Sequence, residues 1–98
     1  MSDYQVRFSA MASDPLPDDA ADLLRAAMET MPGPDAVHGA TYDQESRIVS
    51  GEFRLEVRHG MAEAARDGSR LAKQALRNSG LPDAKLVELL IAFRPSAE

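Results

Sequence analysis

The segment from Arg47 to Arg58 carries an apolar or small residue at every second position. These positions are Val49, Gly51, Phe53, Leu55 and Val57. The residues between them are mostly polar, namely Ile48, Ser50, Glu52, Arg54 and Glu56. A period of two residues is that of a β-strand with one buried face and one face in water. The chain is therefore predicted to build a sheet that is covered on one side.

Three more segments are predicted to be strands. Residues 4–10 alternate in the same way, and residues 36–43 are a weaker candidate because Gly39 lowers strand propensity. The polar stretch 43–47 turns the chain back, so that 36–43 and 47–58 form a β-hairpin. The last strand is predicted at 85–93, with one face made of Val87, Leu89, Ile91 and Phe93. Its other face is made of Leu86, Glu88, Leu90 and Ala92.

Two segments have the period of amphipathic helices. The first is 18–31, for which Asp18 or Asp14 is a candidate N-cap. Its apolar stripe consists of Leu23, Leu24, Ala27, Met28 and Met31. The second is 61–79, which ends before Gly80. Its apolar stripe consists of Met61, Ala64, Ala65, Gly68, Leu71, Ala72, Ala75 and Leu76. The small residues of this stripe would let the helix lie close to a sheet.

The predicted order, strand-helix-strand-strand-helix-strand, resembles the ferredoxin-like split βαβ fold. The resemblance covers nearly the whole chain. It implies an α+β sandwich, in which two helices cover one face of a four-stranded antiparallel sheet and the last strand lies at an edge beside the first. We interpret residues 1–98 as a single domain with a frayed tail at 94–98. Many unrelated functions use this fold, so the resemblance assigns none.

Composition excludes some classes of function. The 98 residues include no cysteine, which removes disulfides, thiolate nucleophiles and thiol metal ligands. The acidic net charge of −5 argues against nucleic-acid binding by the protein as a whole. The longest apolar run, 89–93, is too short to cross a membrane, and the first residues lack the pattern of a signal peptide. We therefore expect a cytoplasmic protein without a membrane partner.

The outward face of the last strand is the most informative surface that the sequence predicts. In the expected fold this face has no helix over it, and leucine is unusual on a solvated sheet. Leu86, Glu88, Leu90 and Ala92 are therefore a candidate homodimer interface, with two sheets packed face to face or two edges paired. The alternative is that a loop or the tail covers the leucines.

The second helix carries a basic stripe that consists of Arg66, Arg70, Lys73 and Arg77. Spacings of four, three and four residues place these side chains on one face of the helix. The stripe is a candidate patch for an anion or an acidic partner. The alternative is a solvated helix face, in which Glu63 and Asp67 pair with the nearby arginines.

Candidates for catalysis are few. His38, His59 and Tyr42 can exchange protons, and His59 lies at a strand-to-helix junction. Each histidine also has an ordinary explanation as an exposed strand or turn residue. Two histidines without cysteine predict no metal site, and the acidic residues at 14–22 fit helix capping better than a calcium loop. Phosphate-binding and dinucleotide motifs are missing from the sequence, so we expect no cofactor.

Three classes of function remain open. The sequence favours a non-enzymatic interaction or regulatory module, a homodimer that binds a partner protein or a small effector. Small-molecule modules of the ACT type share the element order but place a glycine in the first turn, whereas 11–17 contains none. The second class is a small cofactor-free enzyme with a cleft between sheet and helices, as in dimeric ferredoxin-like monooxygenases and muconolactone-type isomerases. The third is nucleic-acid binding through the basic stripe.

Overall fold

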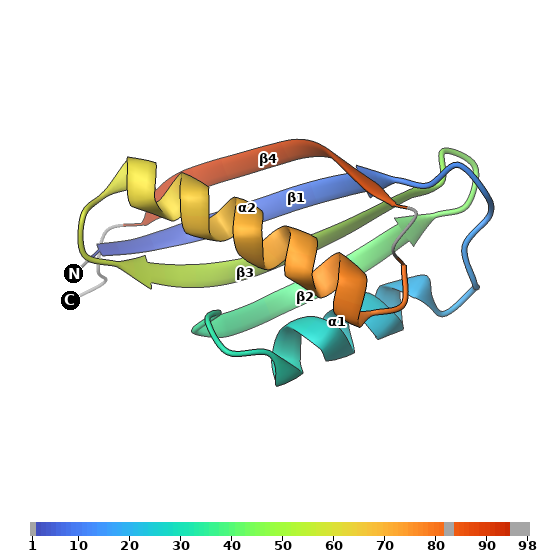
Figure 1. Cartoon of the computed structure of the whole chain (residues 1–98), viewed down its shortest axis with the longest axis horizontal. Coiled ribbons are helices and arrows are strands. Elements are labelled where there is room, and N and C mark those ends of the chain that lie inside the picture. Colours follow the sequence, from blue (N-terminus) through green and yellow to red (C-terminus); the bar gives the residue numbers. More distant parts are fainter. Residues whose placement is uncertain (1, 82–83, 95–98) are drawn as a thin grey trace.

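The computed structural model describes residues 2–81 and 84–94, and its elements follow one another in the predicted order (Figure 1). The strands are β1 (Ser2–Met11), β2 (Ala36–Asp43), β3 (Ile48–Val57) and β4 (Lys85–Arg94). The helices are α1 (Ala20–Thr30) and α2 (Met61–Asn78). All neighbouring strands are antiparallel, in the order β2-β3-β1-β4. The expected ferredoxin-like arrangement is confirmed, with β2 and β4 at the edges of the sheet.

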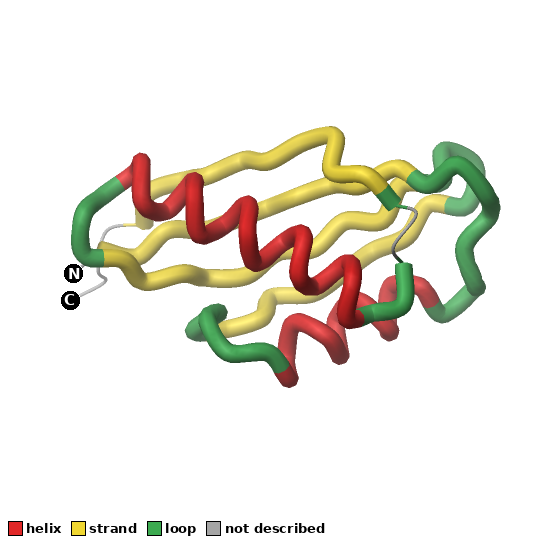
Figure 2. The backbone as a smooth tube through the Cα atoms, viewed as in Figure 1, coloured by secondary structure: helices red, strands yellow, loops and turns green. Residues whose placement is uncertain are grey.

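One face of β1 lies at the centre of the core. Its buried residues are Tyr4, Val6, Phe8 and Ala10, and we call their side of the sheet the inner face. In the register of the sheet they stand opposite Leu55, Phe53, Gly51 and Val49 of β3. Figure 2 shows α1 and α2 on the same side of the sheet, so that neither helix covers the opposite side, the outer face.

Two glycines allow the helices to pack closely on the inner face. A Cβ atom on Gly51 of β3 would lie 2.6 Å from Cζ of Phe8 and 3.1 Å from Cε of Met28 in α1. A Cβ atom on Gly68 of α2 would lie 3.2 Å from Cγ1 of Val6. Carbon atoms in contact are normally about 3.5–4.0 Å apart. The missing Cβ atoms therefore leave the space that the neighbouring side chains fill.

The start of α1 differs from the prediction. Asp19 occupies the N-cap position, but its side chain makes no capping hydrogen bond. The carboxylate of Asp18 instead accepts a 2.7 Å hydrogen bond from the amide of Gln44 in the β2–β3 turn. Capping by Asp18 or Asp14 is therefore wrong, because the available carboxylate binds a distant turn. Leu23, expected in the apolar stripe, is partly exposed.

The ends of α2 have local explanations. The carboxylate of Glu63 accepts a 2.8 Å hydrogen bond from the backbone N–H of His59, just before the helix. At the other end Gly80 has a φ angle of +79°, which confirms the predicted glycine stop. Met61, expected in the apolar stripe, is about half exposed at the first turn. Within the part of the chain that the structure describes, neither helix has the length and apolar character that crossing a bilayer would require.

A β-bulge changes the facing of β4 near its start. Ser9 of β1 stands opposite Glu88, but the next residue, Ala10, stands opposite Leu86, so Val87 is an extra residue. Leu86 therefore shares the inner face with Ala10 and packs against the core. The prediction that Leu86 lies on the same face as Glu88, Leu90 and Ala92 is wrong for this reason.

The end of β4 also differs from the prediction. Arg94, assigned to the frayed tail 94–98, pairs with Asp3 of β1 as the last residue of the strand. The rest of that predicted tail, 95–98, lies outside the described residues.

A second bulge resolves the ambiguous facing of β2. Val37 stands opposite Phe53 and Gly39 stands opposite Glu52, so His38 is the extra residue. Beyond the bulge Tyr42 pairs with Val49, which places its side chain on the inner face. The two edge strands thus each contain one bulge, in both cases at the third residue of the strand.

Replacement of Gly51 by alanine is expected to lower the free energy of unfolding by about 1–3 kcal/mol, because the new methyl group overlaps the ring of Phe8. Urea denaturation followed by circular dichroism measures the change. Thr41→Ala, at an exposed position of β2, is the control and should change stability by less than about 0.5 kcal/mol. Equal stability of Gly51→Ala and wild type would show that the packing is looser than described.

Candidate functional site

The outer face of the sheet is lined mainly with polar and charged side chains. Across β1 and β3, Arg7 stands opposite Glu52 and Gln5 stands opposite Arg54. In the next row Oγ of Ser9 lies 2.9 Å from Oγ of Ser50, within hydrogen-bond distance. Such alternating charges and hydroxyls are typical of a sheet face in water.

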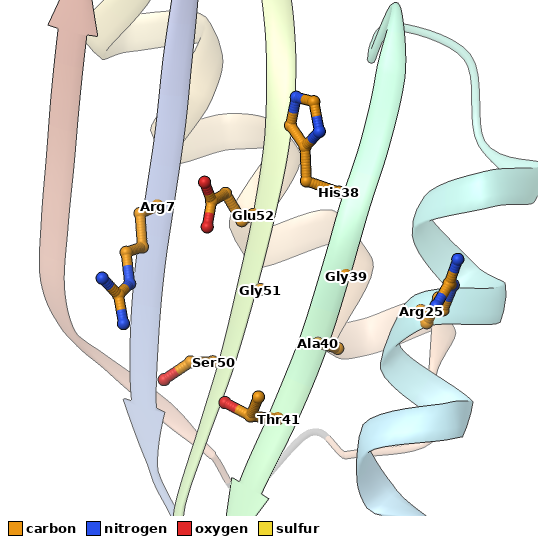
Figure 3. Close-up of a pocket in the computed structure, with 9 residues that line it drawn as sticks. All are labelled: Arg7, Arg25, His38, Gly39, Ala40, Thr41, Ser50, Gly51 and Glu52. Carbon is orange, nitrogen blue, oxygen red and sulfur yellow. The ribbon is translucent and has the colours of Figure 1, made fainter.

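A shallow polar hollow lies on this face near β2 (Figure 3). Its volume is about 330 Å³, and its lining residues are Arg7, Arg25, His38, Gly39, Ala40, Thr41, Ser50, Gly51 and Glu52. Figure 3 shows that most of these come from β1, β2 and β3, whereas Arg25 lies apart on α1. Arg25 forms an ion pair with Glu29 on the same helix, in which its Nε lies 2.9 Å from a carboxylate oxygen. Among the described residues, none makes a hydrogen bond or ion pair with the imidazole of His38.

The three catalytic candidates do not come together. His38 lies at the bulge of β2 beside the polar hollow, whereas Tyr42 points to the inner face. His59 follows the end of β3, while Val49, the partner of Tyr42, is near the start of that strand. The structure therefore does not assemble His38, Tyr42 and His59 into one site.

The hydroxyl of Tyr42 has a structural contact instead. It accepts a hydrogen bond of 3.1 Å from the backbone N–H of Leu16. Leu16 belongs to the loop between β1 and α1, which carries two prolines. The bond therefore holds this loop against β2.

The basic stripe of α2 is exposed along its whole length. Nε of Arg66 lies 3.6 Å from a carboxylate oxygen of Asp67, and the ion pair is weak because the Arg66 side chain is largely in water. At the other end of the stripe, Lys73 and Arg77 border a groove between α2 and the start of β4. The stripe is thus partly a solvated face and partly the wall of a groove.

This groove combines apolar and cationic groups. Its volume is about 450 Å³, and it is lined by Lys73, Leu76, Arg77, Ala84, Lys85 and Leu86. Leu76, Ala84 and Leu86 supply apolar surface, and the three cations supply positive charge. The chemistry suits a ligand with an apolar body and an anionic end. Sequence reasoning missed the groove because its two walls are separate elements, and only the inward turn of Leu86 at the bulge completes it.

Three carboxylates also come together unexpectedly. The side chains of Asp3, Asp35 and Glu56 each place an oxygen within 4.8 Å of the others. Sequence reasoning missed this cluster because its members come from β1, the loop before β2, and β3. Asp35 and Glu56 are exposed, and groups of exposed carboxylates are common on protein surfaces.

The clearest surface feature is the edge strand β4. Val87, Leu90 and Phe93 are 55%, 50% and 54% exposed. They account for half of the large apolar residues that are exposed in the described part of the chain, the others being Met11, Leu23 and Met61. Leu90 lies opposite Arg7 on the outer face, and Phe93 lies opposite Tyr4 on the inner face. The apolar surface therefore continues around the strand from one face of the sheet to the other.

No protein-family model and no curated protein matches this sequence. The surfaces described above are therefore the basis for assigning a function.

Removal of the Tyr42 hydroxyl tests whether this residue is structural. Tyr42→Phe is expected to lower the free energy of unfolding by about 0.5–1.5 kcal/mol, because the N–H of Leu16 loses its acceptor. Tyr4→Phe is the matched control, since the Tyr4 hydroxyl makes no hydrogen bond with the described residues, and it should be close to neutral. Thermal and urea unfolding of both variants measure the difference. Equal effects of the two substitutions would contradict the structural role.

Proposed function

We propose that this protein is a non-enzymatic interaction module that forms a homodimer through the edge of β4. The observation that carries the proposal is the half-exposed apolar surface of Val87, Leu90 and Phe93 on this edge strand. An edge strand presents unpaired backbone N–H and C=O groups, and apolar side chains beside them favour the addition of another strand. A second copy of the chain supplies such a strand with the same surface.

The two edges of the sheet differ in how well they are protected. Between Glu88 and Arg94, β4 has five consecutive uncharged residues, all of them apolar. The other edge, β2, has only five regularly paired residues beyond its bulge, and these begin with Gly39 and end at Asp43. Short regular segments and charges are among the means by which proteins protect an edge from pairing. We therefore assign the dimer contact to β4.

Edge pairing is better supported than face-to-face packing of two sheets. Face-to-face packing would remove Arg7, Glu52 and Arg54 from water, and an imperfectly paired buried charge is costly. Edge pairing leaves these side chains solvated and covers only the margin of the face, where Leu90 and Ala92 lie.

A dimer of this kind would leave the groove between α2 and β4 as the place for a partner or effector. We propose an acidic partner segment or a small anionic effector there, because Lys73, Arg77 and Lys85 line it together with apolar surface. A cofactor-free enzyme has less support, since His38, His59 and Tyr42 lie apart. Nucleic-acid binding through the stripe rests on charge alone. A cytoplasmic location remains the expectation from the sequence.

The dimer contact can be tested at Leu90, a large apolar residue that β4 exposes on the outer face. We expect Leu90→Lys to raise the dissociation constant of the dimer at least about tenfold, because the substitution acts twice in a symmetric pair and adds like charges near each other. Sedimentation equilibrium over a concentration series measures the constant. Circular dichroism and the melting temperature of the monomer show whether the fold is retained.

Thr41→Lys provides the matched control, because Thr41 is also exposed on the outer face but belongs to the opposite edge strand. Edge pairing through β4 predicts an unchanged dissociation constant for this variant. If both lysines weaken the dimer equally, the outer faces pack together and the edge assignment is wrong. A wild-type protein that stays monomeric throughout the series would refute the homodimer.

A further inference from the structure

We infer that the two copies pair as antiparallel β4 strands with Ile91 on the two-fold axis, so that Glu88 of each copy stands opposite Arg94 of the other. The inference rests on the proposed homodimer and adds its register. It yields a continuous eight-stranded sheet from two four-stranded sheets.

The bulge limits the part of β4 that can pair regularly. Val87 interrupts the ladder with β1, whereas the residues from Glu88 to Arg94 follow β1 in one uninterrupted register. Two identical strands that pair about a two-fold axis perpendicular to the sheet keep each side chain on its own face. The axis must therefore pass beside a residue. The midpoint of 88–94 is Ile91, and this centre uses the whole regular segment.

In this register the side chains of β4 complement one another on both faces. On the outer face Leu90 meets Ala92 of the second copy, a large residue against a small one. On the inner face Leu89 meets Phe93 of the second copy and would cover part of its exposed ring. At the axis Ile91 meets itself, and the branched side chains form a favourable cross-strand pair. Apolar contacts thus occupy the centre of the pairing.

The two ends of the paired segment carry opposite charges. Glu88 stands opposite Ser9 and Arg94 opposite Asp3 in the sheet, and both charged side chains are exposed. The Ile91-centred register makes them cross-strand neighbours, and the symmetry forms this pair twice. Opposite charges directly across two strands stabilise the pairing, whereas like charges oppose it.

Neighbouring registers lack this complementarity. A centre at Leu90 would place Glu88 opposite Ala92, and would place Arg94 opposite Leu86, which the bulge turns to the other face. A centre at Ala92 would place Arg94 opposite Leu90 and would shorten the described paired segment to residues 90–94. Neither register places an acidic residue directly across from Arg94.

Arg94 is also positioned for this contact within its own chain. Its guanidinium donates a hydrogen bond to the side-chain oxygen of Gln5. Its cross-strand neighbour in β1 is Asp3. In the proposed register Arg94 lies between Asp3 of its own chain and Glu88 of the second copy, so one cation separates two acidic side chains.

Two charge-reversal variants test the register through heterodimer formation. Glu88→Arg and Arg94→Glu are each expected to raise the homodimer dissociation constant about tenfold at low salt, because two attractive pairs become repulsive. In a mixture the two variants regain opposite charges at both ends of the strand. With one variant labelled with ¹⁵N, native mass spectrometry should show a heterodimer fraction well above the half that random exchange produces.

Glu45→Arg replaces Glu88→Arg in the control mixture, because Glu45 lies in the exposed β2–β3 turn. In this control mixture the heterodimer fraction should exceed the random half only as far as the repulsive Arg94→Glu homodimer is replaced.

If Leu90→Lys disrupts the dimer but the paired variants exchange at random, β4 forms the interface in another register and this inference is wrong. If wild type is monomeric at every concentration, the homodimer itself fails. The doubly reversed chain, Glu88→Arg with Arg94→Glu, should dimerise better than either single variant.

Discussion

The burial of the inner face of β1 is the constraint on which the rest of the structure depends. β1 pairs with β3 on one side and β4 on the other, and Val6 fills the space left by Gly68 of α2. Because α2 packs directly on β1, it also lies against β4, where Ile91 approaches the same glycine. The position of the exposed edge strand is therefore determined by contacts at the centre of the sheet.

The element order and most of the core could be predicted from periodicity, because alternation and the helical period report burial within one element. The facing of Leu86 could not. From Leu86 to Phe93 the sequence is apolar at every position except Glu88, so it carries no sign of an interruption, and Val87 becomes an extra residue only through pairing with β1. The predicted N-cap of α1 was wrong for a similar reason, because Asp18 meets Gln44 only after the β2–β3 hairpin packs near the helix. Both of these errors arose where a contact between distant segments overrode a local pattern.

The candidate surfaces divide in the same way. The apolar edge and the basic stripe were visible in the sequence because each belongs to one element. The groove was not, since it needs Lys73 and Arg77 of α2 beside Lys85 and Leu86 of β4. The carboxylates of Asp3, Asp35 and Glu56 likewise meet only after three segments converge. Tyr42 had the residue type of a catalytic group, but it faces inward and its hydroxyl accepts a hydrogen bond from the backbone of Leu16.

The length and composition of the regular segment beyond each bulge explain why one edge of the sheet is suited to pairing and the other is not. A bulge twists a strand and interrupts its ladder, so the length of regular strand beyond it determines how much a second strand can bind. In β2 the bulge at His38 leaves two short pieces, neither with a large exposed apolar residue. In β4 the bulge at Val87 is also the third residue of the strand, but the regular segment that follows, from Glu88 to Arg94, is longer and more apolar than that of β2. The same bulge turns Leu86 toward the groove, so one local irregularity separates the strand into a part that lines the groove and a part available for pairing.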